Sequence, residues 1–246
     1  MHRVLACLLT IALTGAVAQD ERRVSSPDGQ LEFRILIAQP ENGALFRLAY
    51  QVHFRGKPLV DTSFLGLNIS SQEPVLGENV GLTSSRTSSE KGYNALVAEY
   101  MQNGSIGRRI NVEVRAANDG IAFRYVVPRS TPLQEILIED EMTEFDLAGT
   151  GARGSEGSGR MEFPIVVRQP EAGSVAITEV GAWNYPRASL ERESGTILIT
   201  RLAGRVGDSH VAFEGTTPLV CPWRVVIVGL DRERLGQAQI LQALAR

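Results

Sequence analysis

Apolar and polar residues alternate along most of the chain with a period of two. This period is typical of strands that have one buried face. The alternation begins in residues 31–38, after Pro27-Asp28-Gly29, and continues in residues 45–54, after Asn42-Gly43, a hairpin signal. The same pattern predicts strands at 93–101, 110–116, 121–127, 165–168, 174–180, 196–201, 210–213 and 223–228.

Only residues 235–244 have apolar positions at helical spacing with no internal proline. Two stretches lack a period: residues 70–90, rich in serine and threonine, and the glycine-rich residues 147–159. We expect both to be loops. Many short strands and one terminal helix predict an all-β fold, an antiparallel β-sandwich with a short C-terminal helix.

The composition narrows the class of protein. A hydrophobic content of 43% is too high for a disordered chain, and the formal net charge is −3. Because the lysines and arginines form no run, the sequence argues against a nucleic-acid-binding protein and a protein that binds anionic membranes.

The first 18 residues resemble a secretory signal peptide. Basic His2 and Arg3 precede an apolar run at 4–12, and Ala16-Val17-Ala18 offers a small-residue cleavage site. We expect cleavage after Ala18, a secreted or periplasmic protein, and a single domain over residues 19–246. No later apolar stretch is long enough to span a membrane. Cleavage would leave Cys221 as the only cysteine, without a partner for an intramolecular disulfide.

The sequence contains no catalytic motif that we can assign. His53 and His210 fall outside metal-binding motifs, there is no GxSxG, and the glycines form no phosphate-binding loop. For both histidines, an ordinary position in a strand or on the surface is favoured over a catalytic role. An acidic cluster at 139–146 is expected to be a solvated edge, because closely spaced like charges prefer water and the cluster lacks the spacing of a calcium loop.

Glu179 differs from that cluster because it lies inside an apolar strand. A carboxylate in such a place is costly unless it faces solvent, is paired or hydrogen-bonded, or binds a metal. Alternation along the strand favours an outward-facing side chain. Trp183, Asn184 and Tyr185 follow at a turn, and aromatic rings beside a polar group suit stacking on a sugar ring as well as they suit core packing.

Five short segments occur in the order of one known family: SSPDGQL at 25–31, SFLGL at 63–67, NDGIAFRY at 118–125, TEV at 178–180 with NYP at 184–186, and PWRVV at 222–226. In this order they resemble the N-terminal domain of glycoside hydrolase family 97, over nearly the whole chain after the signal peptide. The resemblance implies a β-supersandwich related to galactose mutarotase-like domains.

The resemblance also implies a function. In this family the domain precedes a (β/α)₈ barrel that acts on α-glucosides or α-galactosides. The N-terminal domain helps to form the wall of the sugar pocket and supplies one glutamate to a calcium site that the barrel completes. The matching position is Glu179. A barrel needs about 250 residues, and this sequence ends at Arg246, so we expect the accessory domain without the catalytic machinery.

Three hypotheses follow. The first is a non-catalytic carbohydrate-associated module that uses Trp183, Asn184 and Tyr185 for sugar, with Ca²⁺ at Glu179 only if a separate barrel completes the site. The second is an aldose mutarotase-type enzyme, for which His53 or His210 with Glu179 is the available acid and base set. The third is a periplasmic interaction protein or a remnant without sugar affinity.

Overall fold

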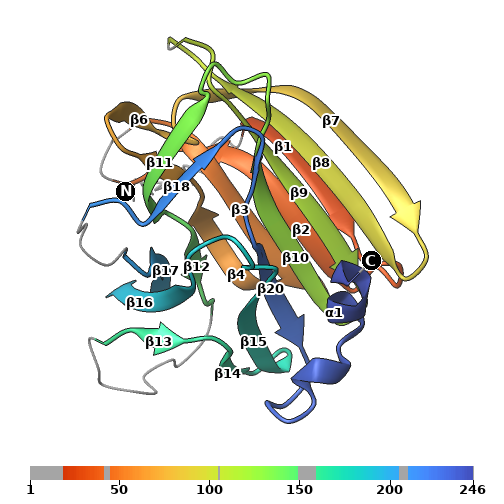
Figure 1. Ribbon diagram of the computed structural model, residues 1–246. Coiled ribbons are helices and arrows are strands. Elements are labelled where there is room, and N and C mark those ends of the chain that lie inside the picture. Colours follow the sequence, from red (N-terminus) through yellow and green to blue (C-terminus); the bar gives the residue numbers. More distant parts are fainter. Residues whose placement is uncertain (1–18, 42–44, 105, 149–158, 205–209, 246) are drawn as a thin grey trace, which may run out of the picture.

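The computed structural model describes residues 19–41, 45–104, 106–148, 159–204 and 210–245. The predicted signal peptide and most of the glycine-rich stretch 147–159 lie outside the described residues. The described chain is almost entirely antiparallel strands, as the alternation predicts, with one short helix near the end (Figure 1).

The strands form three sheets. The first sheet has the order β1 (Gln19–Ser25), β2 (Leu31–Ala38), β3 (Arg47–Phe54), β4 (Lys57–Phe64), β12 (Glu144–Asp146), β17 (Ile197–Leu202), β16 (Ala188–Ser194) and β13 (Met161–Glu162). The second sheet has the order β14 (Ile165–Gln169), β15 (Gly173–Val180), β20 (Trp223–Val228), β10 (Gly120–Val127), β9 (Arg109–Ala117), β8 (Tyr93–Gln102) and β7 (Val80–Glu90), and β19 (Leu219–Val220) also pairs with β10. The third, small sheet has the order β18 (Phe213–Thr216), β11 (Glu135–Glu141), β5 (Leu67–Ile69) and β6 (Gln72–Leu76).

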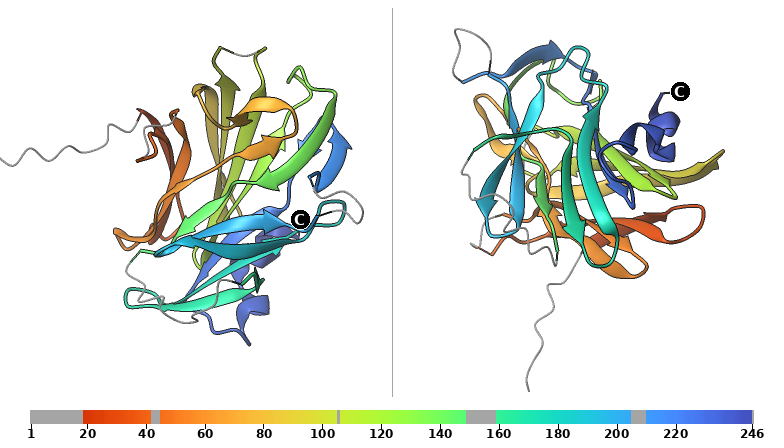
Figure 2. Two further views of the ribbon diagram at one scale, coloured as in Figure 1. Left: turned by 90° about the vertical axis from the view of Figure 1, so that its left-hand side faces the viewer. Right: turned by 90° about the horizontal axis from the view of Figure 1, so that it is seen from below.

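The first and second sheets face each other and enclose the main core. Figure 2 shows the red and orange strands of the first sheet opposite the yellow and green strands of the second. Four contacting aromatic rings join these layers: Phe33, Tyr50 and Phe145 from the first sheet, and Phe123 from β10 of the second. The fold is thus the predicted β-sandwich.

Residues 70–90 are not a loop, contrary to the prediction from composition. They contain β6 and β7, and β7 pairs with β8 along nearly its whole length. Because β7 is an edge strand whose side chains from Thr83 to Glu90 are all exposed, no buried face imposes an alternating pattern. The strand predicted at 210–213 was also misplaced, since β18 begins at Phe213.

The predicted helix at 235–244 is divided. A 3₁₀ turn, η1 (Leu235–Gln237), precedes α1 (Gln239–Leu244), and Ala238 between them is extended. The carboxylate of Asp119 accepts hydrogen bonds from the amides of Gln239 (2.5 Å) and Ile240 (3.1 Å), and so caps the start of α1. No helix in the described ranges is long and apolar enough to cross a bilayer.

Candidate functional site

The loop between β15 and β16 carries the three residues predicted to contact sugar. Trp183, Asn184 and Tyr185 line one open hollow of about 770 Å³, which we call the Trp183 hollow. Its other lining residues come from β11, from β18 and from the adjoining loops: Glu135, Pro186, Ala203, Ala212, Phe213, Glu214, Gly215 and Thr216. The hollow has the size of a small-ligand site.

The two aromatic residues of the loop have different environments. Trp183 is 92% exposed, so its ring is available to an incoming ligand. Tyr185 is buried and packs against Phe213 with 5.1 Å between ring centroids. Trp183 can therefore offer a stacking surface, whereas Tyr185 is held by its packing against Phe213, another residue that lines the hollow. Contact of these residues with a sugar stays a prediction.

A second hollow, of about 410 Å³, is also lined by Trp183, and we call it the Glu179 hollow. Its lining includes Glu162, Glu179, Arg187 and Trp183. Trp183, in the loop after β15, thus lines both hollows.

Glu179 does not face solvent freely, which corrects the outward orientation predicted from alternation. It lies directly opposite Arg224 in the β15–β20 ladder, so the two side chains share the inner face of the second sheet. One oxygen, Oε2, accepts a hydrogen bond from Nη1 of Arg224 at 2.5 Å, and the Glu179 side chain is 13% exposed. An ion pair therefore compensates the carboxylate in this apolar strand.

Arg224 also holds Glu141, a member of the acidic cluster. Nε and Nη2 of Arg224 donate to the two Glu141 oxygens at 2.7 and 2.6 Å, and both side chains are about 1% exposed. Burial alone would lower the pKa of Arg224, but the carboxylates of Glu141 and Glu179 raise it above its usual value. The expectation of a solvated acidic edge is therefore wrong for Glu141.

The buried polar network continues from Glu141, in the small sheet, to Thr143 and to Tyr125 on β10. Thr143 donates from its hydroxyl to Oε1 of Glu141 at 2.8 Å and shares a 2.6 Å hydrogen bond with the hydroxyl of Tyr125. The Tyr125 hydroxyl accepts from the amide of Gly66 at 3.2 Å. We call Arg224, Glu141, Glu179, Thr143 and Tyr125 the Arg224 network; it ties the hollowed loop region to the core.

The fit of a calcium ion can be judged from the donor atoms. No group of three potential ligands among histidine, cysteine, aspartate and glutamate occurs in the described residues. Calcium takes six to eight oxygens, so this part of the chain does not form a complete site. Glu179 has a second oxygen, Oε1, whose contact with the amide of Ala188 is long at 3.4 Å. That oxygen could provide one ligand to a site completed by another domain.

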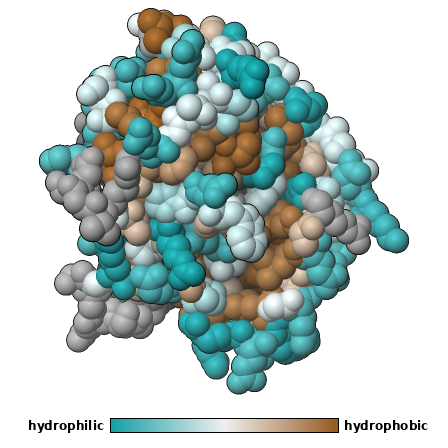
Figure 3. All heavy atoms as spheres, in the orientation of Figure 1, coloured by the Kyte–Doolittle hydropathy of each residue, from teal (hydrophilic) through white to brown (hydrophobic). Residues whose placement is uncertain are grey.

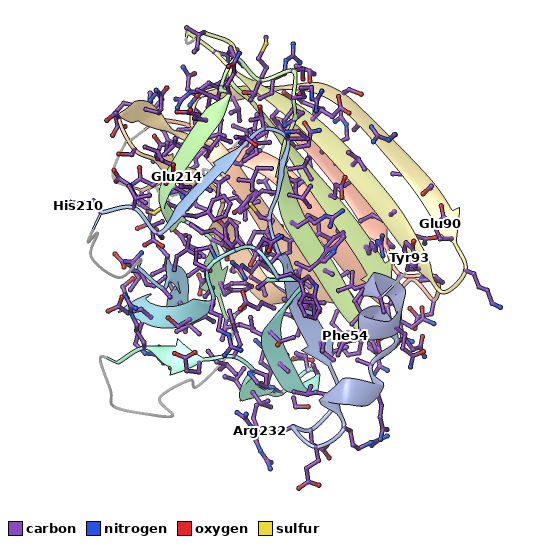
Figure 4. All side chains as sticks on the ribbon, viewed as in Figure 1. Phe54, Glu90, Tyr93, His210, Glu214 and Arg232 are labelled. Atoms are coloured by element: carbon purple, nitrogen blue, oxygen red, sulfur yellow. The ribbon has the colours of Figure 1, made fainter. Side chains whose placement is uncertain are left out.

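The structure does not bring the proposed acid and base set together. The charged groups acting on His53 are Arg34, Glu32, Asp61 and Glu21, all from β1, β2 and β4 of the first sheet, whereas Glu179 faces Arg224 in the second. Figure 4 shows His210 at one edge of the molecule. Burial raises the pKa of the Cys221 thiol to about 12, so this cysteine is protonated and poorly nucleophilic near neutral pH.

His53 gives a prediction for the pH dependence of stability. Burial and the nearby Arg34 charge lower its folded-state pKa below the usual value of about 6.5. The folded state therefore binds the proton less readily than the unfolded state, so stability is full above about pH 6.5 and falls as the pH drops toward the folded-state pKa. We expect His53→Gln to flatten the fall in urea midpoint between pH 7.5 and pH 5.5. An unchanged slope in the variant would contradict this assignment.

Several residues of the site were not found from the sequence. Phe213, Glu135 and Glu214 reach the Trp183 hollow from strands distant in the chain. The sequence did contain a signal for Arg224, because it is the single charged residue within the apolar strand β20. Glu179 is likewise the single charged residue in the apolar strand β15. Two such isolated opposite charges suggest a buried pair.

Known proteins resemble this chain over nearly all of its length. A family model described as glycosyl-hydrolase 97 N-terminal matches residues 24–153 and 150–246. The retaining alpha-galactosidase of Bacteroides thetaiotaomicron is 24% identical over 257 residues, covering 87% of this chain and 35% of that protein.

Solved structures share the fold. A glycoside hydrolase family 97 enzyme from Pseudoalteromonas sp. strain K8, in complex with acarbose, matches with a TM-score of 0.69 and 20% identity, over 85% of this chain and 35% of its own. A crystal structure of beta-arabinopyranosidase matches with the same TM-score and identity, over 86% of this chain and 40% of its own. The chain thus spans a little over a third of the length of these relatives.

Proposed function

Because the chain belongs to the glycosyl-hydrolase 97 N-terminal family, we propose that it is a non-catalytic carbohydrate-associated domain that binds sugar at the Trp183 hollow or docks on a catalytic barrel. The observation that carries this proposal is the 92% exposed ring of Trp183 in a hollow that also contains Asn184. An exposed aromatic ring stacks on the apolar face of a sugar, and an amide can bond its hydroxyl groups.

The proposed sugars are α-glucosides and α-galactosides. The relatives are named as an alpha-galactosidase, a beta-arabinopyranosidase and an enzyme that binds acarbose. The name beta-arabinopyranosidase refers to a pyranose, and a pyranose ring has apolar faces that a tryptophan can cover.

The proposed partner is a (β/α)₈ catalytic barrel of the same family. Figure 3 shows apolar patches beside β11 and β18 and between β15 and α1 on the face that carries the hollowed loop region. Leu137 on β11 and Val220 on β19 are 38% and 48% exposed. Exposed apolar patches are typical of interaction surfaces. In such a complex Glu179 would contribute one carboxylate oxygen to a shared calcium site.

The test of sugar binding is Trp183→Ala. We expect the chain to bind maltose or an α-galactoside measurably by calorimetry, and the variant to lose at least about tenfold in affinity, which corresponds to about 1.4 kcal/mol. The reason is that the indole supplies the largest exposed apolar surface of the hollow. The free energy of unfolding should change little, because the side chain makes few contacts.

Ile106→Ala is the matched control, because Ile106 is also exposed, at 68%, but lies in the turn between β8 and β9. It should bind sugar like the unchanged chain. If the unchanged chain neither binds these sugars nor associates with a family 97 barrel, the proposed function is wrong. Faster mutarotation of fresh α-glucose in its presence would favour the enzymatic hypothesis instead.

A further inference from the structure

One edge of the second sheet is long and open. It is formed by β7, whose eleven residues make it the longest edge strand in the described part of the chain. One side of β7 pairs with β8, and no described strand pairs with its other side. Figure 1 shows β7 as the outermost strand of this sheet. Such an edge presents a row of backbone N–H and C=O groups that a further strand can bind.

The other edge strands of the described sheets carry features that prevent pairing between molecules. β1 has a register shift and four successive charged residues at 20–23, and β6 contains Pro74. β13, β14 and β18 are short, with two, five and four residues. Bulges, charges, proline and short length all protect sheet edges. By contrast, Ser84–Glu90 on β7 contains no proline and keeps a continuous register with β8.

The open edge is held in place by its neighbours. From β1 of the first sheet, Nε of Arg22 donates a hydrogen bond to the hydroxyl oxygen of Ser85 at 3.0 Å. On the β8 side, the Thr83 hydroxyl donates to the carbonyl oxygen of Glu99 at 3.0 Å, and Nη1 of Arg86 donates to the Glu99 carboxylate at 2.9 Å. A strand that is already ordered loses little conformational entropy when a second strand binds to it.

The charges of β7 are self-complementary. Its two charged residues are Arg86 and Glu90, and the Ser88 hydroxyl between them donates to Glu90 at 3.1 Å. Because side chains alternate along a strand, these three residues share one face. If two copies of β7 pair antiparallel with Ser88 at the centre, each Arg86 lies directly opposite the Glu90 of the other copy. Opposite charges in this position stabilise a strand pair.

Arg86 can take part in this contact while it keeps its own partner. A guanidinium has five N–H donors, so Arg86 can hold Glu99 of its own chain and a carboxylate of the other chain together. A pairing centred on Arg86 itself would instead place two like charges opposite each other, which is destabilising. The charges therefore favour the register centred on Ser88. Figure 4 shows Glu90 near the end of this strand, at the margin of the molecule.

We propose that β7 is a docking edge for a second copy of this chain. The two β7 strands pair antiparallel about a twofold axis at Ser88, and the second sheets of the two molecules join into one. The contact involves one short strand segment from each molecule, so the dimer is weak and depends on concentration. The dimer is independent of sugar binding, because Trp183 follows β15, far from β7 in the strand order of this sheet.

Sedimentation equilibrium of the full chain tests the self-association. We expect mostly monomer at about 5 µM and at least half dimer at about 1 mM, the range of weak contacts of this kind. Trp183→Ala should associate like the unchanged chain, because its residue lies outside the docking edge. A chain that stays monomeric at about 1 mM would overturn the proposal.

Charge variants test the pairing of Arg86 with Glu90. Glu90→Arg and Arg86→Glu each place like charges opposite each other in a homodimer, so each variant alone should associate at least about tenfold more weakly than the unchanged chain. An equimolar mixture of the two variants restores both opposite-charge pairs, and should associate to within about threefold of the unchanged chain. Misfolded variants would not regain association on mixing. Unchanged association of the single variants, or a mixture that stays dissociated, would refute the proposed dimer.

Two cysteine variants test the register. Ser88→Cys places the two new thiols opposite each other at the axis, where Cβ atoms are about 4.5–5.5 Å apart, so diamide should join the chains by a disulfide. Ser84→Cys is the matched control: Ser84 is exposed on the same face, but in this register it lies about 27 Å from its copy. Cys221 is buried and should not react, and the unchanged chain gives the background. Equal cross-linking of both variants would contradict the register and the proposal.

Discussion

Arg224→Ala should lower the free energy of unfolding by about 3–5 kcal/mol, the cost of breaking a buried ion pair by removing one partner. Arg224 is fully buried and donates to both oxygens of Glu141 and to Glu179. Its removal leaves Glu141 buried without its cation, in a place where water cannot replace the lost bonds. Urea denaturation of the unchanged chain and the variant measures the difference.

Two comparisons make this expectation specific. Glu179→Gln should cost less than Arg224→Ala, because Arg224 then keeps its two bonds to Glu141. Arg86→Ala is the matched surface control: Arg86 pairs with Glu99 at 2.9 Å, but its side chain is 64% exposed, so the loss should stay below about 1 kcal/mol. Equal losses for Arg224→Ala and Arg86→Ala would show that the Arg224 network does not stabilise the fold.

Phe123→Ala should be about as severe, with a loss of about 3–5 kcal/mol. Phe123 is fully buried on β10, and its ring centroid lies 4.7 Å from that of Tyr50, 5.6 Å from that of Phe33 and 6.2 Å from that of Phe145. Truncation to alanine removes the Phe123 ring, which the second sheet contributes to this cluster, and leaves a cavity between the two sheets. Thermal unfolding followed by near-ultraviolet circular dichroism measures the loss.

Phe123→Leu should recover part of this stability, because leucine fills part of the same volume. Phe46→Ala provides the exposed control, since Phe46 is 41% exposed and lies before β3. A loss for Phe123→Ala no larger than that for Phe46→Ala would mean that the four rings are not the centre of the core.

The segment 183–185 and Glu179 show how far local sequence reaches toward the site. Trp183, Asn184 and Tyr185 are neighbours in the chain, so a turn after an apolar strand was enough to predict that they lie together, and they do line one hollow. The environment of Glu179 was predicted wrongly, because its partner Arg224 is 45 residues away and meets it only through the pairing of β15 with β20. Glu141 is 83 residues from Arg224 and lies in the small third sheet.

The sequence by itself determined the strand content, the terminal helix and the family, because alternation, turn residues and short motifs are local properties of the chain. The tertiary structure decided which polar residues are buried together and which line the Trp183 hollow. It also decided that residues 80–90 form an edge strand, whose exposed faces leave no hydrophobic period to detect. The physical reason is that burial and ion pairing depend on which strands become neighbours, and the spacing of residues along one strand does not specify that neighbour.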